Sequence, residues 1–337
     1  MAKYALIIDS NRRYTPGLNA LLNSLDRIGN EHDVWVCSYR LPTGYKEAID
    51  AAGFTYRVEW REAPDQLILK WGEGDVMMRY RYSMPSKMCR YGCSPRRDRD
   101  EMVCEYDAVC VLDADMWVEE DLTPWLDIAA QTDYVFGCGH EQHRKYDDPN
   151  HSYPNGQGWI IETDHMWFND LCSVPLIAGK RWYPSLLKSW EMYAQDQSTR
   201  IRSNDMDALN IALISDGAHP SMMPLPQQLW TGLHECMLKA HTRARMHEGR
   251  VCTEDGQRIK LVHGQYWNLT WRGDQVGNQS RMIDREFNGS ASYHSRSEAS
   301  MQFLVDRFMH HSVRHKVNIE DFMEQIQPGI KSILESV

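Results

Sequence analysis

A short apolar run that ends in two carboxylates constrains the fold of this chain more than any other feature. Ala108 to Leu112 is continuous, apolar and rich in β-branched residues, which is typical of a central strand covered on both faces. Asp113 and Asp115 follow it. Because side chains two residues apart on a strand point the same way, both carboxylates are predicted to emerge together at the carboxyl edge of a sheet. Two adjacent like charges favour a cation between them, and hard oxygen donors suit Mg²⁺ or Mn²⁺.

Two other Asp-x-Asp triplets give weaker indications. Asp98 to Asp100 lies in an arginine-rich run that is typical of a solvated loop. Asp205-Met-Asp207 begins a segment, 205–214, with apolar residues at helical spacing, so its simplest interpretation is a helix N-cap with an acidic first turn. The pair after the apolar run has a structural alternative too, since two aspartates can cap a helix. Context favours a metal and diphosphate site at Asp113 and Asp115 alone.

Composition limits the class of protein. The 337 residues include 37 Lys and Arg against 47 Asp and Glu, a formal charge of −10 that argues against a broad nucleic-acid-binding surface and leaves a local basic groove open. Nine irregularly spaced cysteines indicate reduced core thiols rather than a disulfide framework. The sequence shows neither a signal-peptide pattern nor an apolar window of membrane-spanning length, so we expect a cytoplasmic protein without a membrane partner.

Strand-like and helix-like segments alternate along the first part of the chain. Expected strands are 4–8, 34–37, 54–60, 108–112 and 134–138, and expected helices begin at Thr15-Pro16, Tyr45 and Thr123-Pro124. This alternation predicts an α/β fold with a mostly parallel central sheet flanked by helices. Further strands are expected at 159–161 and 166–168 and a helix at 186–194, after a His-rich loop, 139–158, that we assign to the acceptor side or to a lid, without a metal role.

The rest of the chain is expected to add a hairpin and a small appendage. Asp255-Gly256 lies between two short β-like runs, and the second run leads into His263. A histidine at a strand end usually has a structural role, unless other metal-ligating side chains lie close to it in the fold. Residues 273–297 are rich in Gly, Asn and Ser and are assigned as a linker between a catalytic domain, 1–272, and a C-terminal helical appendage, 298–337. The appendage, with expected helices at 298–312 and 319–335, is a candidate for homo-oligomer contacts.

Several short motifs occur in a fixed order over residues 3–268. They are Ser10-Asn11 through Tyr14, Ser86-Lys87-Met88, Tyr106 through Asp115, Trp167-Phe-Asn169, Asp205-Met-Asp-Ala-Leu-Asn210 and His263-Gly264. As an ordered set they resemble the retaining GT-A glycosyltransferases of the glycogenin and galactinol-synthase type, glycosyltransferase family 8. The resemblance implies transfer of a sugar from a nucleoside-diphosphate sugar, a UDP-sugar foremost, to an acceptor hydroxyl.

The resemblance also implies roles for individual residues. Asp113, Asp115 and His263 would bind Mn²⁺ or Mg²⁺, and Lys87 would clamp the diphosphate. Asp205 and Asp207 would hold the sugar hydroxyls or steady an oxocarbenium-like transition state, so they and Lys87 are the candidate catalytic residues. The full set implied to contact the nucleotide sugar is Asp9, Asn11, Tyr14, Lys87, Asp113, Ala114, Asp115, Asn169, Asp205, His263 and Gly264.

The sequence departs from the family pattern at two places. Met206 stands where the family has a Gln near the reacting carbon of the donor, which puts the catalytic assistance of that position in doubt. After His263 the family's Gly and Lys-Pro-Trp are replaced by Gln265-Tyr-Trp267, so the phosphate-clamping lysine of that segment is either absent or supplied from elsewhere, with Lys260 as the candidate.

Two other functions compete with sugar transfer. A nucleotidyltransferase shares the sheet and the acidic metal site, but it usually carries a Gly-rich loop after the first strand, and residues 9–13 contain no glycine. A catalytically inactive sugar-nucleotide or glycan-binding module is the other alternative, and the complete acid and histidine set argues against it. The acceptor stays open between a glycan, favoured by the aromatic loop 139–158, and a modified DNA base, favoured by arginine clusters such as Arg243 to Arg245.

Overall fold

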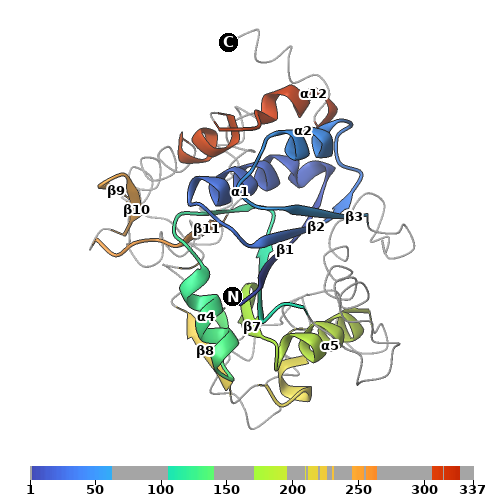
Figure 1. Cartoon of the computed structure of the whole chain (residues 1–337), viewed down its shortest axis with the longest axis vertical. Coiled ribbons are helices and arrows are strands. Elements are labelled where there is room, and N and C mark those ends of the chain that lie inside the picture. The colour runs from blue at the N-terminus through green and yellow to red at the C-terminus, as the bar shows by residue number, and fades with distance from the viewer. Residues whose placement is uncertain are drawn as a thin grey trace, which may run out of the picture.

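A seven-stranded sheet forms the centre of the molecule, with helices on its faces (Figure 1). The computed structural model describes residues 2–62, 105–139, 171–195, 209, 212–218, 221–225, 230, 245–253, 256–263, 306–313 and 315–326. Among these residues, no helix combines the length and apolar character needed to cross a membrane. Four buried cysteines in this part of the chain, Cys37, Cys110, Cys138 and Cys252, are free thiols, which confirms the expectation for them.

The strands of the central sheet run in the order β3-β2-β1-β4-β7-β6-β8. Their bounds are β1 Tyr4–Asn11, β2 Asp33–Tyr39, β3 Val58–Glu62, β4 Ala108–Asp113, β6 Val135–Gly139, β7 Leu171–Gly179 and β8 Met222–Leu225. The helices are α1 Thr15–Arg27, α2 Tyr45–Ala51, α4 Thr123–Gln131, α5 Tyr183–Gln195 and α12 Met323–Ile326, with 3-10 turns η1 Arg12–Tyr14 and η8 Ile319–Phe322.

The mostly parallel sheet predicted from the alternation is confirmed. Strands β1 to β4 are mutually parallel where they pair, and all six residues of β4 are buried, as expected for a strand covered on both faces. Strand β7 was not predicted; it runs antiparallel to both β4 and β6. Because Pro175 lies inside β7 and cannot donate a ladder hydrogen bond, its local sequence argues against a central strand.

Two small ladders lie beside the main sheet. One pairs β5, Met116–Val118, antiparallel with β11, Leu261–His263, and the other pairs β9, Arg245–His247, with β10, Arg250–Cys252. The predicted hairpin around Gly256 is present in part, as a bridge between Cys252 and Arg258. The β5–β11 ladder brings His263 close to the end of β4.

The C-terminal segment packs against α1, which is buried over nearly its whole length. Asn19 donates hydrogen bonds to the carbonyl oxygens of Ser312 (2.9 Å) and Val317 (3.0 Å), and Asn23 to those of His311 (2.7 Å) and Val317 (3.0 Å). Two asparagines therefore satisfy carbonyl groups at the end of the helical residues 306–313. The expected second helix is short among the described residues, comprising η8 and α12.

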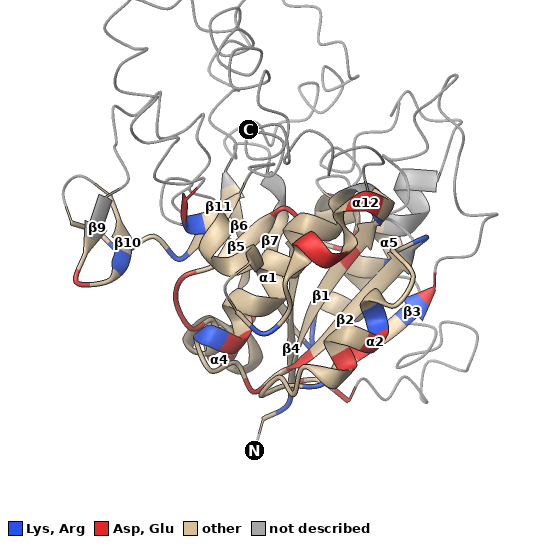
Figure 2. Cartoon of the chain, turned by 90° about the horizontal axis from the view of Figure 1, so that it is seen from above, with Lys and Arg blue, Asp and Glu red and all other residues tan. Residues whose placement is uncertain are grey.

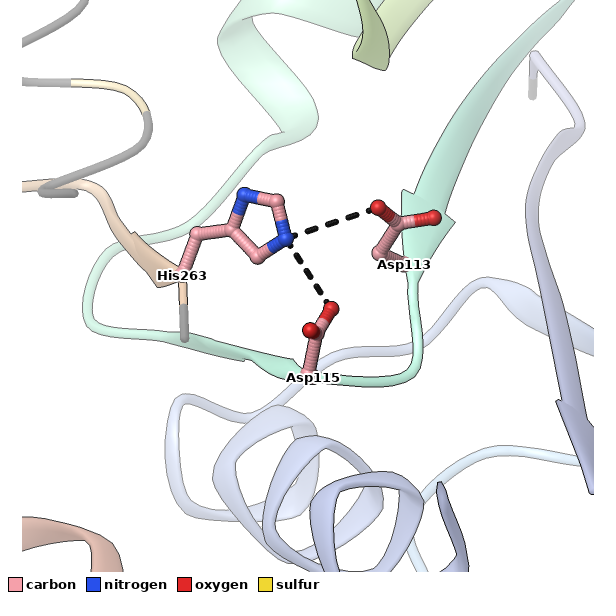
Figure 3. Close-up of side chains that lie close together, drawn as sticks. All are labelled: Asp113, Asp115 and His263. Atoms are coloured by element: carbon pink, nitrogen blue, oxygen red, sulfur yellow. Dashed lines mark hydrogen bonds and ion pairs between the residues drawn. The ribbon is translucent and has the colours of Figure 1, made fainter. Parts of the chain in front are cut away.

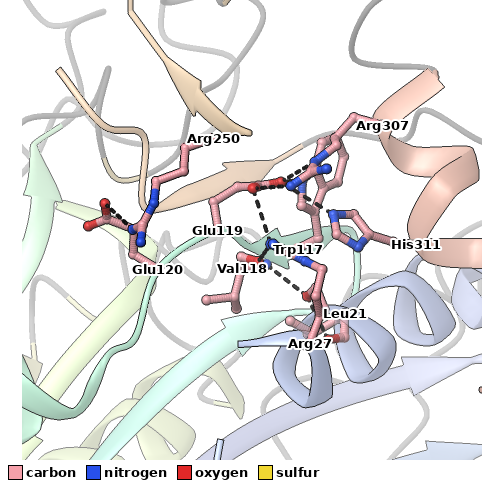
Figure 4. A network of polar contacts seen from close by, with 10 residues as sticks. Leu21, Arg27, Trp117, Val118, Glu119, Glu120, Arg250, Arg307 and His311 are labelled. Carbon is pink, nitrogen blue, oxygen red and sulfur yellow. Dashed lines mark hydrogen bonds and ion pairs between the residues drawn. The ribbon is translucent and has the colours of Figure 1, made fainter. Parts of the chain in front are cut away.

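A buried carboxylate, Glu119, joins α1, β5 and the C-terminal segment (Figure 4). Arg307 donates to both of its oxygens, at 2.8 and 2.7 Å, and Arg27 donates at 3.1 Å. The indole of Trp117 donates at 2.9 Å, and the His311 ring lies 3.3 Å away. We call these five residues the Glu119 cluster. Burial opposes ionisation of Glu119, but the hydrogen bonds from Arg307 and His311 outweigh it and hold the pKa of this carboxyl well below its ordinary range.

The burial of His311 in the Glu119 cluster should make the free energy of unfolding fall at acidic pH. Burial disfavours the charged imidazolium, and with the charges of Arg27 and Arg307 it overcomes the attraction of Glu119 and lowers the pKa of His311 to about 4. The unfolded chain binds this proton near pH 6.5, so below that pH the unfolded state holds more protons than the folded one and stability falls. We expect His311 by itself to contribute a loss of roughly 2 kcal/mol of unfolding free energy between pH 7 and pH 5, read as the difference between the wild type and His311→Gln.

Urea unfolding at several pH values between 5 and 7 measures this loss of stability. Glu119 is mostly ionised in this pH range in both the folded and the unfolded chain, so its own protonation adds little. His311→Gln should flatten the pH dependence, whereas His247→Gln, at an exposed position on β9, should leave it unchanged. An equally steep pH dependence in His311→Gln would show that another group is responsible.

Candidate metal centre

One turn and one antiparallel ladder bring three ligand side chains together beyond the end of β4. Asp113 is the last residue of β4, and a tight turn at Ala114 and Asp115 leads into β5. Strand β11 pairs with β5 so that its last residue, His263, lies opposite Met116. The site is therefore assembled by one turn and one antiparallel ladder, and both are anchored to the buried core.

The mechanism that aligns the two aspartates differs from the one predicted. Strand alternation was expected to point both side chains the same way, but β4 ends at Asp113 and Asp115 lies in the turn. The turn redirects the chain into β5, so the position of the second carboxylate is set by the turn rather than by the two-residue period of a strand. The expectation that the aspartates share one edge holds, while its stated cause was wrong.

The three side chains converge on one point (Figure 3). The His263 Nε2 atom lies 3.0 Å from Asp115 Oδ1 and 3.4 Å from Asp113 Oδ2. One ligand atom from each residue lies within 4.8 Å of the others, close enough for a single ion to contact all three. Asp113 and Asp115 are buried, with 8% and 9% of their surface exposed, so solvent screens neither carboxylate fully.

The electrostatics of the site are those of two carboxylates that share one counter-charge. Burial disfavours the imidazolium of His263, but attraction to Asp115 and Asp113 outweighs burial and raises the pKa of His263 to about 10. The imidazolium thus supplies the positive charge between the two aspartates. A divalent cation satisfies the same demand, because carboxylates and a neutral imidazole are ordinary metal ligands and the cation would displace the proton. The donor set fits Mn²⁺ or Mg²⁺.

Other predicted site residues lie at the same edge of the sheet. Asp9 pairs in register with Asp113 across β1 and β4, and Asn11 ends β1 two residues further on. The Asn11 side chain accepts a hydrogen bond from the Tyr14 backbone N–H at 3.3 Å, which ties the following turn to the strand end. Tyr14 is partly buried and packs against the core, and Ala114 is buried in the turn.

The remaining predicted site residues lie outside the described part of the chain. These are Lys87, Asn169, Asp205, Asp207 and Gly264, together with Met206. Lys260, the candidate replacement for the phosphate-clamping lysine, lies directly before β11, and its ammonium group pairs with Glu120. Its role at a phosphate stays a prediction.

The buried position of Glu119, next to the strand that pairs with β11, was not predicted from the sequence. It lies directly after β5, one residue past the strand that aligns His263. In the sequence, Glu119-Glu-Asp121 precedes the predicted helix start at Thr123, and Asp121 accepts a hydrogen bond from the Thr123 N–H at 2.9 Å. No local pattern distinguishes the buried Glu119 from its neighbours, because its arginine partners lie far away in the sequence.

Comparison with known proteins shows which solved structures share this architecture. Neither the models of protein families nor the curated proteins gave a match. A solved structure of an active-site mutant of LgtC aligns over 78% of this chain and 89% of that one, with a TM-score of 0.50 and 14% identity. The galactosyltransferase LgtC with donor and acceptor sugar analogs aligns over 77% of this chain and 86% of that one, with a TM-score of 0.49 and 13% identity. The bifunctional glycosyltransferase WbbM aligns over 79% of this chain and 47% of that one, with a TM-score of 0.49 and 13% identity. The likeness to the LgtC mutant confirms the predicted GT-A type of α/β fold.

Proposed function

We propose that this protein is a metal-dependent glycosyltransferase that moves a sugar from a nucleoside-diphosphate sugar, a UDP-sugar foremost, to an acceptor hydroxyl with retention. The observation that carries the proposal is the convergence of Asp113, Asp115 and His263 at the carboxyl end of β4. In open α/β sheets, ligands bind outside the carboxyl ends of the strands. A fold shared with LgtC and the ordered motifs of the sequence give the same assignment.

The acid and histidine set would hold Mn²⁺ or Mg²⁺ against the diphosphate of the donor. The ion would neutralise the charge that develops on the diphosphate as the glycosidic bond lengthens. Asp113 and Asp115 are buried behind the turn and anchored through β4 and β5, so they hold their positions without reorganisation during the reaction. His263 is held by the β5–β11 ladder and would supply the third ligand.

The other residues of the site would bind and orient the donor. Tyr14 offers its ring for stacking on the base, and Asp9 and Asn11 lie at the end of the neighbouring strand. By the resemblance of their motifs, Lys87 would add positive charge at the diphosphate. In the same way Asn169, Asp205 and Asp207 would hold the sugar hydroxyls, and Gly264 would allow the diphosphate close to the backbone.

Donor turnover tests the proposal directly. Release of nucleoside diphosphate is measured from a panel of nucleotide sugars with Mn²⁺, with Mg²⁺ and with EDTA, each in the presence of glycan acceptors or DNA that carries hydroxymethylated bases. We expect turnover of one donor in the presence of metal and its loss in EDTA, restored by excess Mn²⁺. Pyrophosphate-forming turnover of a nucleoside triphosphate and a sugar phosphate would instead identify a nucleotidyltransferase.

Removal of the histidine ligand should weaken metal binding without preventing it. His263→Gln leaves two carboxylates, so we expect Mn²⁺ affinity to fall by about tenfold to a hundredfold and to be recovered in part at high Mn²⁺ concentration. Electron paramagnetic resonance of free Mn²⁺ reads the affinity independently of turnover. His32→Gln, a partly buried histidine at the opposite end of the sheet, is the matched control. Unchanged Mn²⁺ affinity in His263→Gln would remove His263 from the ligand set.

A further inference from the structure

A three-residue strand, β5, links two of the three side chains of the metal centre. Asp115 directly precedes β5, and His263 lies opposite Met116 in the β5–β11 ladder. Among the described strands, β5 and β11 pair only with each other, in a two-stranded sheet of their own. Because a short two-stranded ladder is only marginally stable by itself, its position is set by the elements that pack against it. The geometry of the metal centre therefore depends on the neighbours of β5.

Helix α1 lies beside β5 and holds the backbone of its last residue (Figure 2). The Val118 N–H donates to Ser24 Oγ at 2.9 Å, and Arg27 Nη2 donates to the Val118 carbonyl oxygen at 3.2 Å. Val118 is at the end of the strand that is remote from Asp115. These hydrogen bonds therefore fix one end of β5, and the alignment of the rest depends on the ladder and on side-chain packing.

The helical residues 306–313 pack on the middle of β5. One face of this segment carries Arg307, Phe308 and His311, since side chains three and four residues apart share a helix face. We call these three residues the β5-contacting face. The rings of Phe308 and His311 lie 6.2 and 6.0 Å from the Trp117 ring, centroid to centroid. Trp117 and Phe308 are each only 1% exposed, so this contact is part of the core.

Arg307 connects the β5-contacting face to the strand through Glu119 (Figure 4). Its guanidinium donates to both Glu119 oxygens, at 2.8 and 2.7 Å, and the Trp117 indole donates to one of them at 2.9 Å. The Glu119 N–H donates to the Lys260 carbonyl oxygen at 2.8 Å, next to the β5–β11 ladder. Paired donors from one guanidinium fix the direction of a carboxylate as well as its distance. Glu119 is thus held by Arg307 on one side and joined to both strands of the ladder on the other.

We propose that the β5-contacting face positions the metal centre, with Arg307 as the positioning residue that acts through Glu119. Only the three residues of β5 separate Glu119 from Asp115. A shift of β5 would displace Asp115 and His263 together, because the turn before the strand carries one and the paired strand carries the other. Metal–ligand distances have to be met within about 0.2 Å, so a small shift weakens binding. The inference rests on the proposed binding of a metal ion by the two aspartates and His263.

The Mn²⁺ affinity of the full chain, read by paramagnetic resonance without any donor sugar, tests the proposal. Arg307→Met keeps an apolar stem and loses the paired donors to Glu119. Arg307→Lys keeps the charge but cannot reproduce the paired donors. The matched control, Lys316→Met, removes a cation from the same C-terminal segment, where it pairs at 2.8 Å with a different buried carboxylate, Asp26. Circular dichroism and urea unfolding measure the fold and the stability of each variant.

We expect Arg307→Met to bind Mn²⁺ about tenfold more weakly than the wild type, the lower end of the effect of residues that orient metal ligands, because it acts through Glu119. Arg307→Lys should recover part of this loss, and Lys316→Met should bind Mn²⁺ as the wild type does. A purely structural role would lower only the free energy of unfolding. Apparent affinity falls with the fraction of competent protein, and this fraction stays near one in a variant that remains folded.

Wild-type Mn²⁺ affinity in a folded Arg307→Met would overturn the inference and leave the metal centre intact. Equal weakening in Arg307→Met and Lys316→Met would also overturn it, since the cause would then be a general loss of packing on α1. Should Arg307→Met fail to fold, Phe308→Leu decides, because it keeps every charge and removes the ring contact with Trp117. Phe308→Leu is expected to weaken Mn²⁺ binding, and an unchanged affinity would refute the role of this face. A wild-type protein that binds no Mn²⁺ would instead refute the metal centre, and this inference with it.

Discussion

Asp115→Asn is expected to reduce metal-dependent release of nucleoside diphosphate by about a thousandfold or more. Asp115 is buried in the turn after β4 and lies 3.0 Å from His263 Nε2, so no solvent-exposed carboxylate can take its place. An Asn keeps the shape but removes the charge that would hold a divalent ion. An ion that stabilises the leaving diphosphate contributes several kcal/mol, and each 1.36 kcal/mol is about tenfold in rate.

The experiment needs two readouts on the same protein. Turnover is measured with saturating donor and Mn²⁺, and Mn²⁺ affinity is measured by paramagnetic resonance. Asp321→Asn, an exposed aspartate in η8, is the matched control and should behave as wild type in both. If Asp115→Asn binds Mn²⁺ normally and turns over at more than about a tenth of the wild-type rate, the assigned metal centre is wrong.

Glu119→Gln is expected to lower the free energy of unfolding by about 3–5 kcal/mol. The Glu119 side chain is 1% exposed, and it accepts hydrogen bonds from Arg307 and Arg27. Loss of the carboxylate charge leaves two guanidinium groups close together without a counter-charge, and burial raises the cost of each. Urea unfolding at pH 7 measures the change.

A surface ion pair supplies the control for this prediction. Glu105 pairs with Lys3 at 2.8 Å, but both side chains are nearly half exposed, so Glu105→Gln should change stability by less than about 1 kcal/mol. A Glu119→Gln variant that loses no more stability than Glu105→Gln would mean that the buried network makes no net contribution. A variant that retains its fold should also bind Mn²⁺ more weakly, because Glu119 anchors one end of the three-residue strand β5 and Asp115 directly precedes the other end.

The elements that were located correctly from the sequence are those encoded by nearby residues. Leu18, Leu21, Leu22 and Leu25 give α1 its helical spacing, and each is fully buried in the structure. Helix α4 begins at Thr123, as predicted from the Thr-Pro pair. Strand β4 is defined by five consecutive apolar residues and its terminal Asp113. In each case the residues that define the element, its apolar spacing or its first or last residue, lie within that element.

Long-range pairing could not be predicted where the local pattern was neutral. Asn19 and Asn23 are polar residues one helical turn apart within an apolar helix, and nothing nearby indicates that they bond to carbonyl groups almost 300 residues away. Strand β7 contains a proline, so its place between β4 and β6 is set by partners on both sides rather than by propensity. Domain boundaries at 272 and 298 remain a proposal, beside the observed packing of residues 306–317 on α1.

The candidate metal centre depends both on a local sequence pattern and on long-range pairing. The amino-acid sequence is sufficient to predict that Asp113 ends a buried strand, because a run of apolar residues specifies burial locally. The position of His263, 148 residues beyond Asp115 and 3.0 Å from it, depends on the folded chain. That distance depends on the β5–β11 ladder and on the buried Glu119 cluster behind it, and such pairing is selected by the joint burial of many elements rather than by any short pattern.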